Sequence, residues 1–250
     1  MSKITQRGAV GALALQAGGS FQQSNDANLS TLIGSRWDLD DGGEVRLVLA
    51  GASNLAAGKL MQSPATVANH QGLTVTAVQA YSANGNVPEK VTVTLGATAA
   101  TANQYAGGYL VVSSGTGLGQ TLRIASHPAA NLSSSLALTL EDVPNTALTT
   151  SSVVDLIPAE CNGVVISDHI ALTTPVGVTL YPITAANYGY VKVKGIVSCL
   201  HDGIAVTGSA LSQSNAVDGA VENGVIAQGF VGQAILASTD TQYQAIRVQL

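Results

Sequence analysis

Short runs in which apolar and polar residues alternate recur along most of the chain. The runs at 73–78 (LTVTAV) and 90–95 (KVTVTL) repeat every two residues, as expected when successive side chains point to opposite faces of a strand. Other runs rich in Val, Leu, Ile and Thr lie at 44–50, 109–113, 136–140, 152–157, 163–167, 190–200, 230–237 and 244–250. Clusters of Gly, Asn, Pro and Asp separate them, so the sequence predicts an all-β fold of sandwich or barrel-like domains.

Helical periodicity is nearly absent from the sequence. The strongest helix candidate is the short segment at 98–106 (TAATANQYA), where the alanines favour a helix and the threonines oppose it. We expect at most one short helix there, within an otherwise strand-rich chain.

The strand pattern divides the chain into three regions. Residues 1–43 lack strand periodicity and predict an extended N-terminal arm with Phe21, Arg36 and Trp37 as isolated anchors. Residues 44–170 predict a β-rich domain, and residues 171–250 a small C-terminal barrel-like domain. Ordering a chain costs about 1–2 kcal/mol per residue, so we expect the arm to be ordered by docking on a neighbouring subunit or partner.

Charged side chains are scarce. They make up 10% of the residues, against about 25% in an average protein. Two interpretations follow: the chain belongs to an assembly in which neighbours cover much of its surface, or it is a charge-poor monomer with a Ser-, Thr- and Asn-rich exterior. We favour the assembly.

The composition also argues against two kinds of partner. Ten Lys and Arg face fifteen Asp and Glu without a basic cluster, which disfavours a nucleic-acid groove. No run approaches the 18 apolar residues of a membrane span. Cys161 and Cys199 are the only cysteines; one bridge between them is possible, but reduced, buried thiols are the favoured interpretation.

A glycine-rich loop follows the apolar run at 109–113. Its sequence, Gly115-Thr116-Gly117-Leu118-Gly119, invites comparison with loops whose amide groups bind phosphate at the start of a helix. Here a strand-like run follows instead, and the Lys-Ser/Thr pair of a phosphate loop is missing. The glycines therefore predict a hairpin turn with positive φ angles.

Four histidines, His70, His127, His169 and His201, are candidates for acid–base chemistry. His169 follows Asp168 and His201 precedes Asp202. Adjacent residues on a strand point to opposite faces, so neither pair is expected to orient itself for catalysis. A Ser/His/Asp site assembled from distant segments stays open. We predict no catalytic residue, metal site or cofactor.

Two adjacent acidic pairs, Glu141-Asp142 and Asp40-Asp41, are candidates for glycosidase carboxylates, which must lie about 5–9.5 Å apart in a cleft. Asp40-Asp41-Gly42-Gly43 is more simply a turn. The stretch at 38–44 (DLDDGGE) only loosely matches a calcium loop, so a turn is again preferred. Trp37 is the only tryptophan, which weakens the case for a sugar-binding platform.

Several segments together resemble the head decoration, or capsid cement, proteins of tailed bacteriophages. They are the stretches at 103–129 (NQYAGGYLVVSSGTGLGQTLRIASHPA), 136–158 (LALTLEDVPNTALTTSSVVDLIP), 187–211 (NYGYVKVKGIVSCLHDGIAVTGSAL) and 226–250 (IAQGFVGQAILASTDTQYQAIRVQL). The resemblance implies a non-enzymatic virion protein, made in the host cytoplasm, that binds the outer surface of the capsid as a homotrimer and clamps neighbouring copies of the major capsid protein.

Within this interpretation, Phe21, Arg36 and Trp37 are the candidate capsid or subunit contacts, because aromatic residues and Arg are enriched at interface anchors. Two alternatives remain. One is a phage tail or fibre component that recognises a host surface. The other is a β-rich depolymerase that cuts surface polysaccharide with Glu141 and Asp142.

Overall fold

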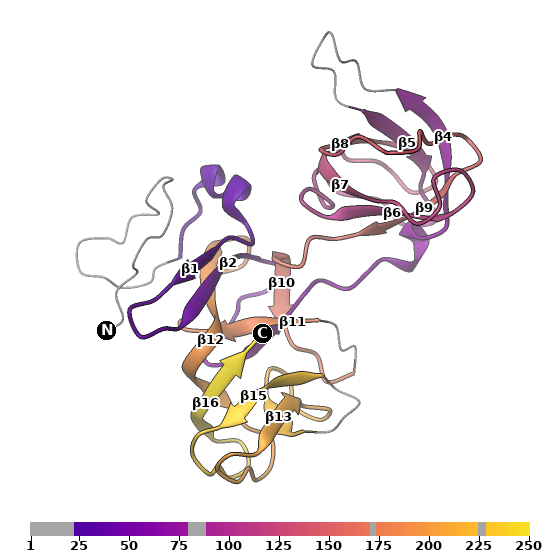
Figure 1. The fold of residues 1–250 in the computed structure, drawn as a ribbon. Coiled ribbons are helices and arrows are strands. Elements are labelled where there is room, and N and C mark those ends of the chain that lie inside the picture. The colour runs from indigo at the N-terminus through magenta and orange to yellow at the C-terminus, as the bar shows by residue number, and fades with distance from the viewer. Residues whose placement is uncertain (1–22, 80–88, 171–173, 225–228) are drawn as a thin grey trace. The chain divides into compact units, whose positions relative to one another are not determined.

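The chain forms two compact units in the computed structural model, which describes residues 23–79, 89–170, 174–224 and 229–250. One unit, here called the sheet unit, contains the described residues up to Pro64 together with Glu160–Leu250. The other, the barrel unit, is Ala65–Ala159 and is inserted into the sheet unit (Figure 1). Each unit has a hydrophobic core of its own.

This division differs from the boundaries near residues 43 and 170 that the sequence predicts. β2 (Glu44–Ala50) pairs antiparallel with β12 (Tyr188–Leu200), so segments more than a hundred residues apart share one sheet. The barrel unit leaves the sheet unit after β3 (Leu60–Gln62) and returns before β10 (Asn162–Ile166), and these two strands pair with each other. The composition along the chain cannot predict such pairing, because it describes only residues that are close in sequence.

The barrel unit is a closed antiparallel barrel. Around it the strands follow the order β4 (Leu73–Gln79), β5 (Lys90–Thr94), β8 (Ser135–Leu140), β7 (Thr121–Ser126), β6 (Tyr109–Ser114) and β9 (Val153–Ile157). Alternate side chains fill its interior: Val91 and Val93 on β5 are buried, whereas Lys90 and Thr94 on either side of them are exposed and Thr92 between them is partly exposed. A short 3₁₀ helix, η2 (Ala68–His70), precedes the first strand.

The sheet unit contains two rings of strands that share β12. The first ring runs β2, β10, β3, β11 (Pro175–Thr179) and β12, and the pairing of β12 with β2 closes it. The second runs β12, β16 (Tyr243–Gln249), β15 (Phe230–Ala234), β13 (Ala210–Gln213) and β14 (Val221–Asn223). A bridge from His201 to Val221 returns this second ring to the end of β12. Each ring has a buried cluster, and the cluster of the second ring also includes Leu60 and Val178 from strands of the first.

Gly195 marks the point where β12 changes partner. Residues of β12 up to Lys194 pair with β2, and those from Lys194 to Leu200 pair with β16. Gly195 has a φ of +105°, and a Cβ there would lie 3.1 Å from the Gly43 Cα. A side chain would be strained at this φ and crowded by the facing backbone, so the switch requires glycine.

Residues 23–43 differ from the extended arm that the sequence predicts. They contain a 3₁₀ helix, η1 (Ala27–Leu32), capped by Asp26, and a short strand, β1 (Arg36–Asp38), paired with β2. Leu29 and Leu39 are buried against Val45, Leu47, Tyr188 and Tyr190. The apolar contacts expected from a partner are therefore supplied over these residues by the chain itself. The rest of the predicted arm, with Phe21, lies outside the described residues.

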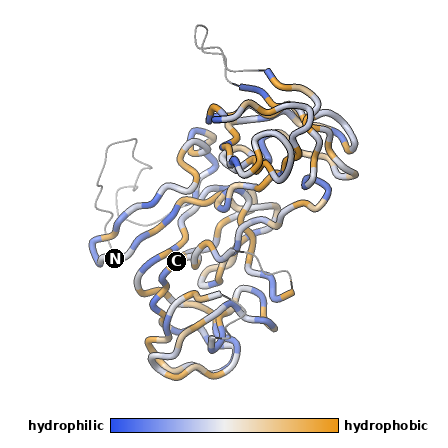
Figure 2. Tube along the Cα trace, turned by 45° about the vertical axis from the view of Figure 1, so that its right-hand side comes forward, coloured by the Kyte–Doolittle hydropathy of each residue, from blue (hydrophilic) through white to orange (hydrophobic). Residues whose placement is uncertain are grey.

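The all-β prediction is confirmed. Each strand segment predicted from the sequence overlaps an observed strand, and 44–50 coincides with β2. Hydrophobic and hydrophilic residues follow one another at short intervals along much of the trace (Figure 2). The short strands β1 and β3 were missed because three residues are too few to show a period.

The helix predicted at 98–106 is wrong. These residues form successive turns, with the amide of Ala106 donating to the Asn103 carbonyl and that of Gly108 to the Tyr105 carbonyl. Asn103 has a φ of +58°, which interrupts a right-handed helix. The turns place Tyr105 in the barrel core. Among the described residues, no helix has the length and apolar character to cross a membrane.

Candidate functional site

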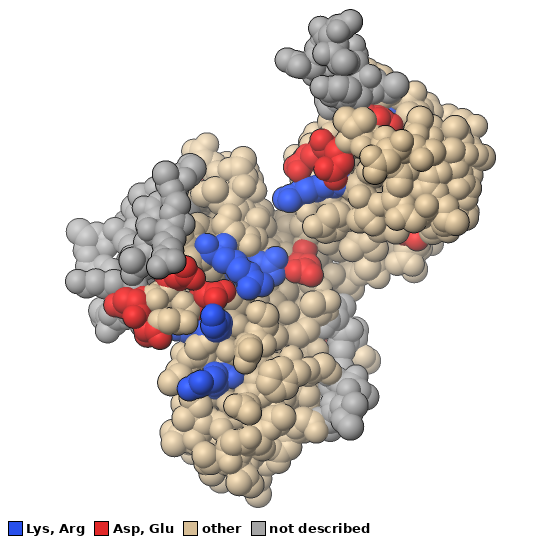
Figure 3. Space-filling model, in the orientation of Figure 1, with Lys and Arg blue, Asp and Glu red and all other residues tan. Residues whose placement is uncertain are grey.

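Most charged contacts of the sheet unit gather over β1, β2 and β12, while much of the visible surface carries no charge (Figure 3). The ion pairs on this face are Arg36–Glu44 (3.5 Å), Lys194–Glu44 (2.9 Å), Arg46–Glu160 (3.1 Å) and Lys192–Asp41 (3.2 Å). The hydrogen bond from Lys194 lowers the pKa of Glu44, and the same contact raises the pKa of Lys194. Acidic and basic groups neutralise each other here, so the face presents no field of one sign.

Arg36 and Trp37, predicted to contact a capsid or subunit, both lie on β1. Arg36 is exposed and pairs with Glu44. Trp37 is half-buried, and its ring meets that of Tyr190 edge to face, with centroids 5.3 Å apart. Their side chains are thus engaged within the chain, Arg36 at the surface and Trp37 against the core.

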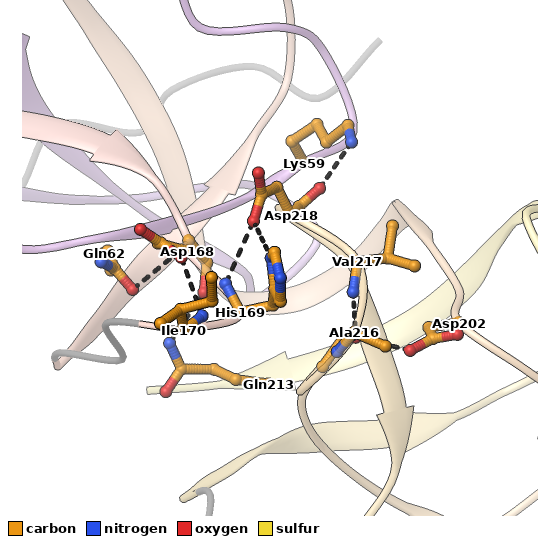
Figure 4. A network of polar contacts seen from close by, with 12 residues as sticks. Lys59, Gln62, Asp168, His169, Ile170, Asp202, Gln213, Ala216, Val217 and Asp218 are labelled. Carbon is orange, nitrogen blue, oxygen red and sulfur yellow. Dashed lines mark hydrogen bonds and ion pairs between the residues drawn. The ribbon is translucent and has the colours of Figure 1, made fainter.

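A second polar cluster joins two loops of the sheet unit (Figure 4). The Nδ1 of His169, after β10, lies 2.7 Å from Oδ1 of Asp218, in the loop between β13 and β14. The backbone N–H of His169 donates to the same oxygen, and Lys59 Nζ donates to the Asp218 carbonyl at 2.6 Å. The hydrogen bonds from His169 lower the pKa of Asp218.

Asp168, His169 and Asp218 are the described residues best placed to hold a cation, since one ligand atom of each lies within 4.8 Å of the others. Imidazole and carboxylate groups are ordinary ligands for transition metals. Two of the ligand atoms, however, are bound to each other, and Asp168 Oδ1 accepts the N–H of Ile170. As it stands, the cluster fastens the two loops together. The carboxylate that meets the His169 ring is that of Asp218, from a distant loop.

His201 meets a serine from a distant segment. Its Nδ1 lies 2.9 Å from Ser238 Oγ, which gives two members of the Ser/His/Asp arrangement left open by the sequence. Both side chains are buried, and His201 Nε2 has no hydrogen-bond partner among the described residues. Asp202 is bound instead by the Ser214 hydroxyl at 2.6 Å. Among the described residues, the pair has no orienting carboxylate, and both side chains are closed off from a substrate, whereas nucleophilic catalysis requires such a carboxylate and access for the substrate.

In the barrel unit, His70 and His127 flank the buried Tyr105. The Tyr105 hydroxyl lies 2.5 Å from His70 Nδ1, and the opposite nitrogen of His70 lies 2.9 Å from the Thr98 carbonyl. Because a carbonyl can only accept, His70 carries its proton on Nε2 and accepts from the tyrosine. The Tyr105 amide donates to His127 Nε2, whose ring then donates from Nδ1 to the Pro128 carbonyl. Both nitrogens of each ring have partners, and the two rings hold the turns at 98–106.

The glycine-rich loop is the hairpin turn that the sequence predicts. It joins the antiparallel strands β6 and β7, and Gly115, Gly117 and Gly119 have φ angles of +78°, +85° and +86°. Gly115 lies so close to the Ser151 carbonyl that a Cβ would overlap it. No helix begins at the loop, as a phosphate site of this kind would need.

The acidic pairs serve as turn and ion-pair residues. Asp142 Oδ2 accepts the Arg123 amide, and Glu141 pairs with the Arg123 guanidinium at 3.1 Å. Asp41 Oδ1 accepts the Gly43 amide, and Gly42 has a φ of +74°, which confirms a turn at 40–43.

Both cysteines are free and buried, as predicted. Burial raises the pKa of the Cys161 thiol to about 11 and that of Cys199 to about 12. Because the thiolate is the reactive form, neither cysteine is poised as a nucleophile.

Two loops at one end of the second ring expose apolar side chains side by side. We call residues 201–209 and 235–242 the loop pair. Backbone hydrogen bonds join Ser238 to Ala205 and Gly208 to Ala234, so Val206 and Leu236 lie at neighbouring positions across the pair. Ile204, Val206 and Leu236 are 69%, 66% and 51% exposed. Sequence reasoning missed this surface, because isolated apolar residues in loops carry no periodic signal.

The partners of His169 and His201 also could not be predicted from the sequence. Asp218 lies 49 residues from His169, and Ser238 lies 37 residues from His201. Serines and aspartates are frequent enough in this chain that only the fold singles out these two.

Comparison of the chain with protein-family models, with curated proteins and with solved structures finds no match. The functional interpretation therefore depends on the sequence pattern and on the surfaces described above.

Proposed function

We propose that the protein is a non-enzymatic virion component that binds the outside of an assembled phage capsid and clamps neighbouring copies of the major capsid protein. In this proposal it acts as a homotrimer and stabilises the mature lattice. The residues quoted above for the resemblance to head decoration proteins suggest this class, and they include parts of both units.

The observation that carries the proposal is the exposure of apolar side chains on the sheet unit, with Val206 and Leu236 of the loop pair at neighbouring positions. The exposed large hydrophobic side chains of this unit are Ile170, Ile196, Ile204, Val206, Phe230, Leu236 and Tyr243. Neighbouring apolar side chains on a protein surface mark contact sites for other proteins. Around Val206 and Leu236, the loop pair carries only Asp202 and Asp240 as charged residues. This surface favours a protein partner with an apolar face over a polyanion or a charged sugar.

The polar clusters support a binding role in a different way. His169, His127 and His70 fasten loops and turns, and Glu141 and Asp142 are bound to Arg123. These side chains are engaged within the chain, as expected for a scaffold that presents loops to a partner.

Co-sedimentation tests the proposal directly. Purified protein is mixed with mature heads assembled from the major capsid protein of the same genome, and separately with the unassembled capsid subunits. We expect the chain to sediment with heads to a fixed number of copies and to leave the subunits unbound. Binding to host cells or glycans with none to heads would favour a tail or fibre component and overturn the proposal.

Matched leucine variants locate the contact. Leu236→Ser removes an exposed apolar side chain from the loop pair, whereas Leu132→Ser removes one of similar exposure from the barrel unit. Because burying a leucine contributes about 1.5–3 kcal/mol, Leu236→Ser should weaken head binding roughly tenfold or more, and Leu132→Ser should leave it unchanged. Equal effects from the two variants would contradict the assignment of this surface.

A further inference from the structure

His201 joins the two loops of the loop pair at the end of the second ring. Its backbone N–H donates to the Gln242 carbonyl, and its own carbonyl accepts from Thr241. Its Nδ1 meets Ser238 Oγ, which also accepts the Ala205 amide at 3.1 Å. One imidazole and one hydroxyl thus connect the start of the first loop, the middle of that loop and the middle of the second.

The imidazole is fully buried, at 0% exposure, yet has only one side-chain partner. His201 Nε2 has no hydrogen-bond partner in the part of the chain that the structure describes. A buried polar nitrogen left unpaired is costly, and few native structures keep one without a role. A neutral imidazole limits this cost, because it has a single N–H group.

We propose that His201 is an acid-sensitive latch, which holds the loop pair closed while neutral and releases it when protonated. A protonated imidazole has two N–H donors. Ser238 Oγ is the partner of Nδ1 within the described structure, and it can accept from the protonated ring only if its hydroxyl hydrogen turns away. The second donor, at Nε2, faces no acceptor among the described residues. Protonation therefore buries a charge with an unpaired donor, and opening the loops relieves this by admitting water.

The charges around His201 do not offset this cost. The titratable groups on the surrounding segments are the buried Cys199 thiol on β12, Asp202 on its own loop, Asp240 on the facing loop, Glu222 on β14 and Tyr243 at the start of β16. Asp240 accepts the Gly203 amide at 3.0 Å, and Asp202 accepts the Ser214 hydroxyl. Burial alone lowers the pKa of His201. The open state, with solvated imidazole, consequently takes up the proton more readily than the closed state.

The sign of the pH dependence follows from this difference. A solvated histidine has a pKa of about 6.5, above that of the closed state. Closure is therefore favoured fully above about pH 6.5 and is progressively lost as the pH falls below it. One proton is taken up on opening, so the opening equilibrium rises by at most about tenfold per pH unit. Release would expose the buried Ala205 and Ser238 beside the apolar contact surface, whether or not that surface binds a capsid.

Hydrogen exchange read by mass spectrometry on the full chain tests the latch. Exchange is measured at pH 7.5, 6.0 and 5.0 and corrected for the intrinsic rate at each pH. In the wild type, amide protection in residues 201–209 and 235–242 should fall below pH 6.5, by up to about tenfold per pH unit. In His201→Asn, whose amide can still bond to Ser238, this pH dependence should vanish. Peptides around His127 in the barrel unit should respond to pH equally in both proteins.

If His201→Asn fails to fold, Ser238→Ala provides a second test of the latch. This variant retains the imidazole but removes its acceptor, so the loops should exchange faster at every pH while keeping their dependence on pH. Wild-type protection of the loop pair that stays constant down to pH 5.0 would overturn the proposal. So would an identical pH dependence in His201→Asn. Neither outcome bears on head binding at pH 7.5, which tests the proposed function separately.

Discussion

At the scale of single residues, glycines and buried histidines determine the local backbone geometry of this protein. Gly115 and Gly119 share the same hairpin and nearly the same φ, +78° and +86°, yet differ in their surroundings. A Cβ at Gly115 would overlap the Ser151 carbonyl, whereas one at Gly119 would have no atom within 4 Å. The two positions therefore separate the cost of backbone strain from the cost of steric overlap.

Alanine substitution at these two glycines should give unequal losses of stability. Gly119→Ala should lower the free energy of unfolding of the barrel unit by about 1–2 kcal/mol, because only a positive φ opposes it. Gly115→Ala should cost at least about 1 kcal/mol more, since the chain around Ser151 must also move. Urea unfolding followed by circular dichroism measures both. Equal losses would show that the contact between the hairpin and Ser151 is not tight.

At His127, burial should make the barrel unit sensitive to acid. Burial lowers the pKa of this ring, whose Nε2 accepts the Tyr105 amide. The unfolded chain, with a histidine pKa of about 6.5, takes up a proton that the folded unit resists. The contribution is complete above about pH 6.5 and is lost below it, by at most about 1.4 kcal/mol per pH unit.

Urea midpoints at pH 7.5 and 5.5 measure this loss. His127→Gln keeps an acceptor for the Tyr105 amide but cannot be protonated in this range. The barrel unit of this variant should therefore lose less stability between the two pH values than the wild type does, and the difference is the contribution of His127. A variant that loses as much stability as the wild type would assign the acid sensitivity to another group.

Among the elements, β12 organises the sheet unit because both rings use it. Its first half carries Lys192, whose side chain is 5% exposed and pairs with Asp41 in the turn between β1 and β2. Asp41 is more exposed, at 43%. Gly43 lies over this ammonium so closely that a Cβ would stand 2.7 Å from it. The ion pair thus ties the β1–β2 turn to the shared strand.

Breaking this pair from either side should have unequal effects. Asp41→Asn leaves the Lys192 ammonium buried without a charged partner and should destabilise the sheet unit by about 1–3 kcal/mol. Lys192→Met removes the buried charge and fills the same space, so it should cost less than Asp41→Asn. The fluorescence of Trp37 during urea unfolding reports on this unit. A larger loss in Lys192→Met would mean that the ammonium is stabilised by other groups.

The elements also show how far sequence reasoning reaches. Strands of five or more residues with period-two patterns, such as β4 and β5, could be predicted because each carries its own periodic signal. The short strand β3, the pairing of β2 with β12, and the loop pair could not, because they are set by contacts between distant segments. The helix prediction at 98–106 was wrong for a related reason. The composition of this segment suits a helix, but the burial of Tyr105 and its bonds to His70 and His127 favour turns.

For the whole molecule, the insertion of one unit into the other is the main architectural feature. The chain enters the barrel unit after β3 and leaves it before β10. These two strands pair with each other, with Gln62 of β3 opposite Val165 of β10. A short loop could therefore replace residues 65–159 without separating these strands, as in a hairpin. The two units also have separate buried clusters.

Excision should accordingly leave two folded proteins. Residues 65–159 alone should give a cooperative thermal transition by circular dichroism, and so should the chain in which a Gly-Ser loop replaces them. If either fragment lacked a cooperative transition while the whole chain showed one, the units would depend on each other for stability.

The clamping of a capsid lattice is tested most directly by the temperature at which mature heads release their DNA, measured with a fluorescent dye across a concentration series of the protein. A ligand that binds only the assembled lattice stabilises it by RT ln(1 + [L]/Kd) at each site. The release temperature should therefore rise with concentration and level off once the sites are filled, with a weaker response for Leu236→Ser than for Leu132→Ser. An unchanged release temperature at concentrations that saturate the heads would contradict clamping.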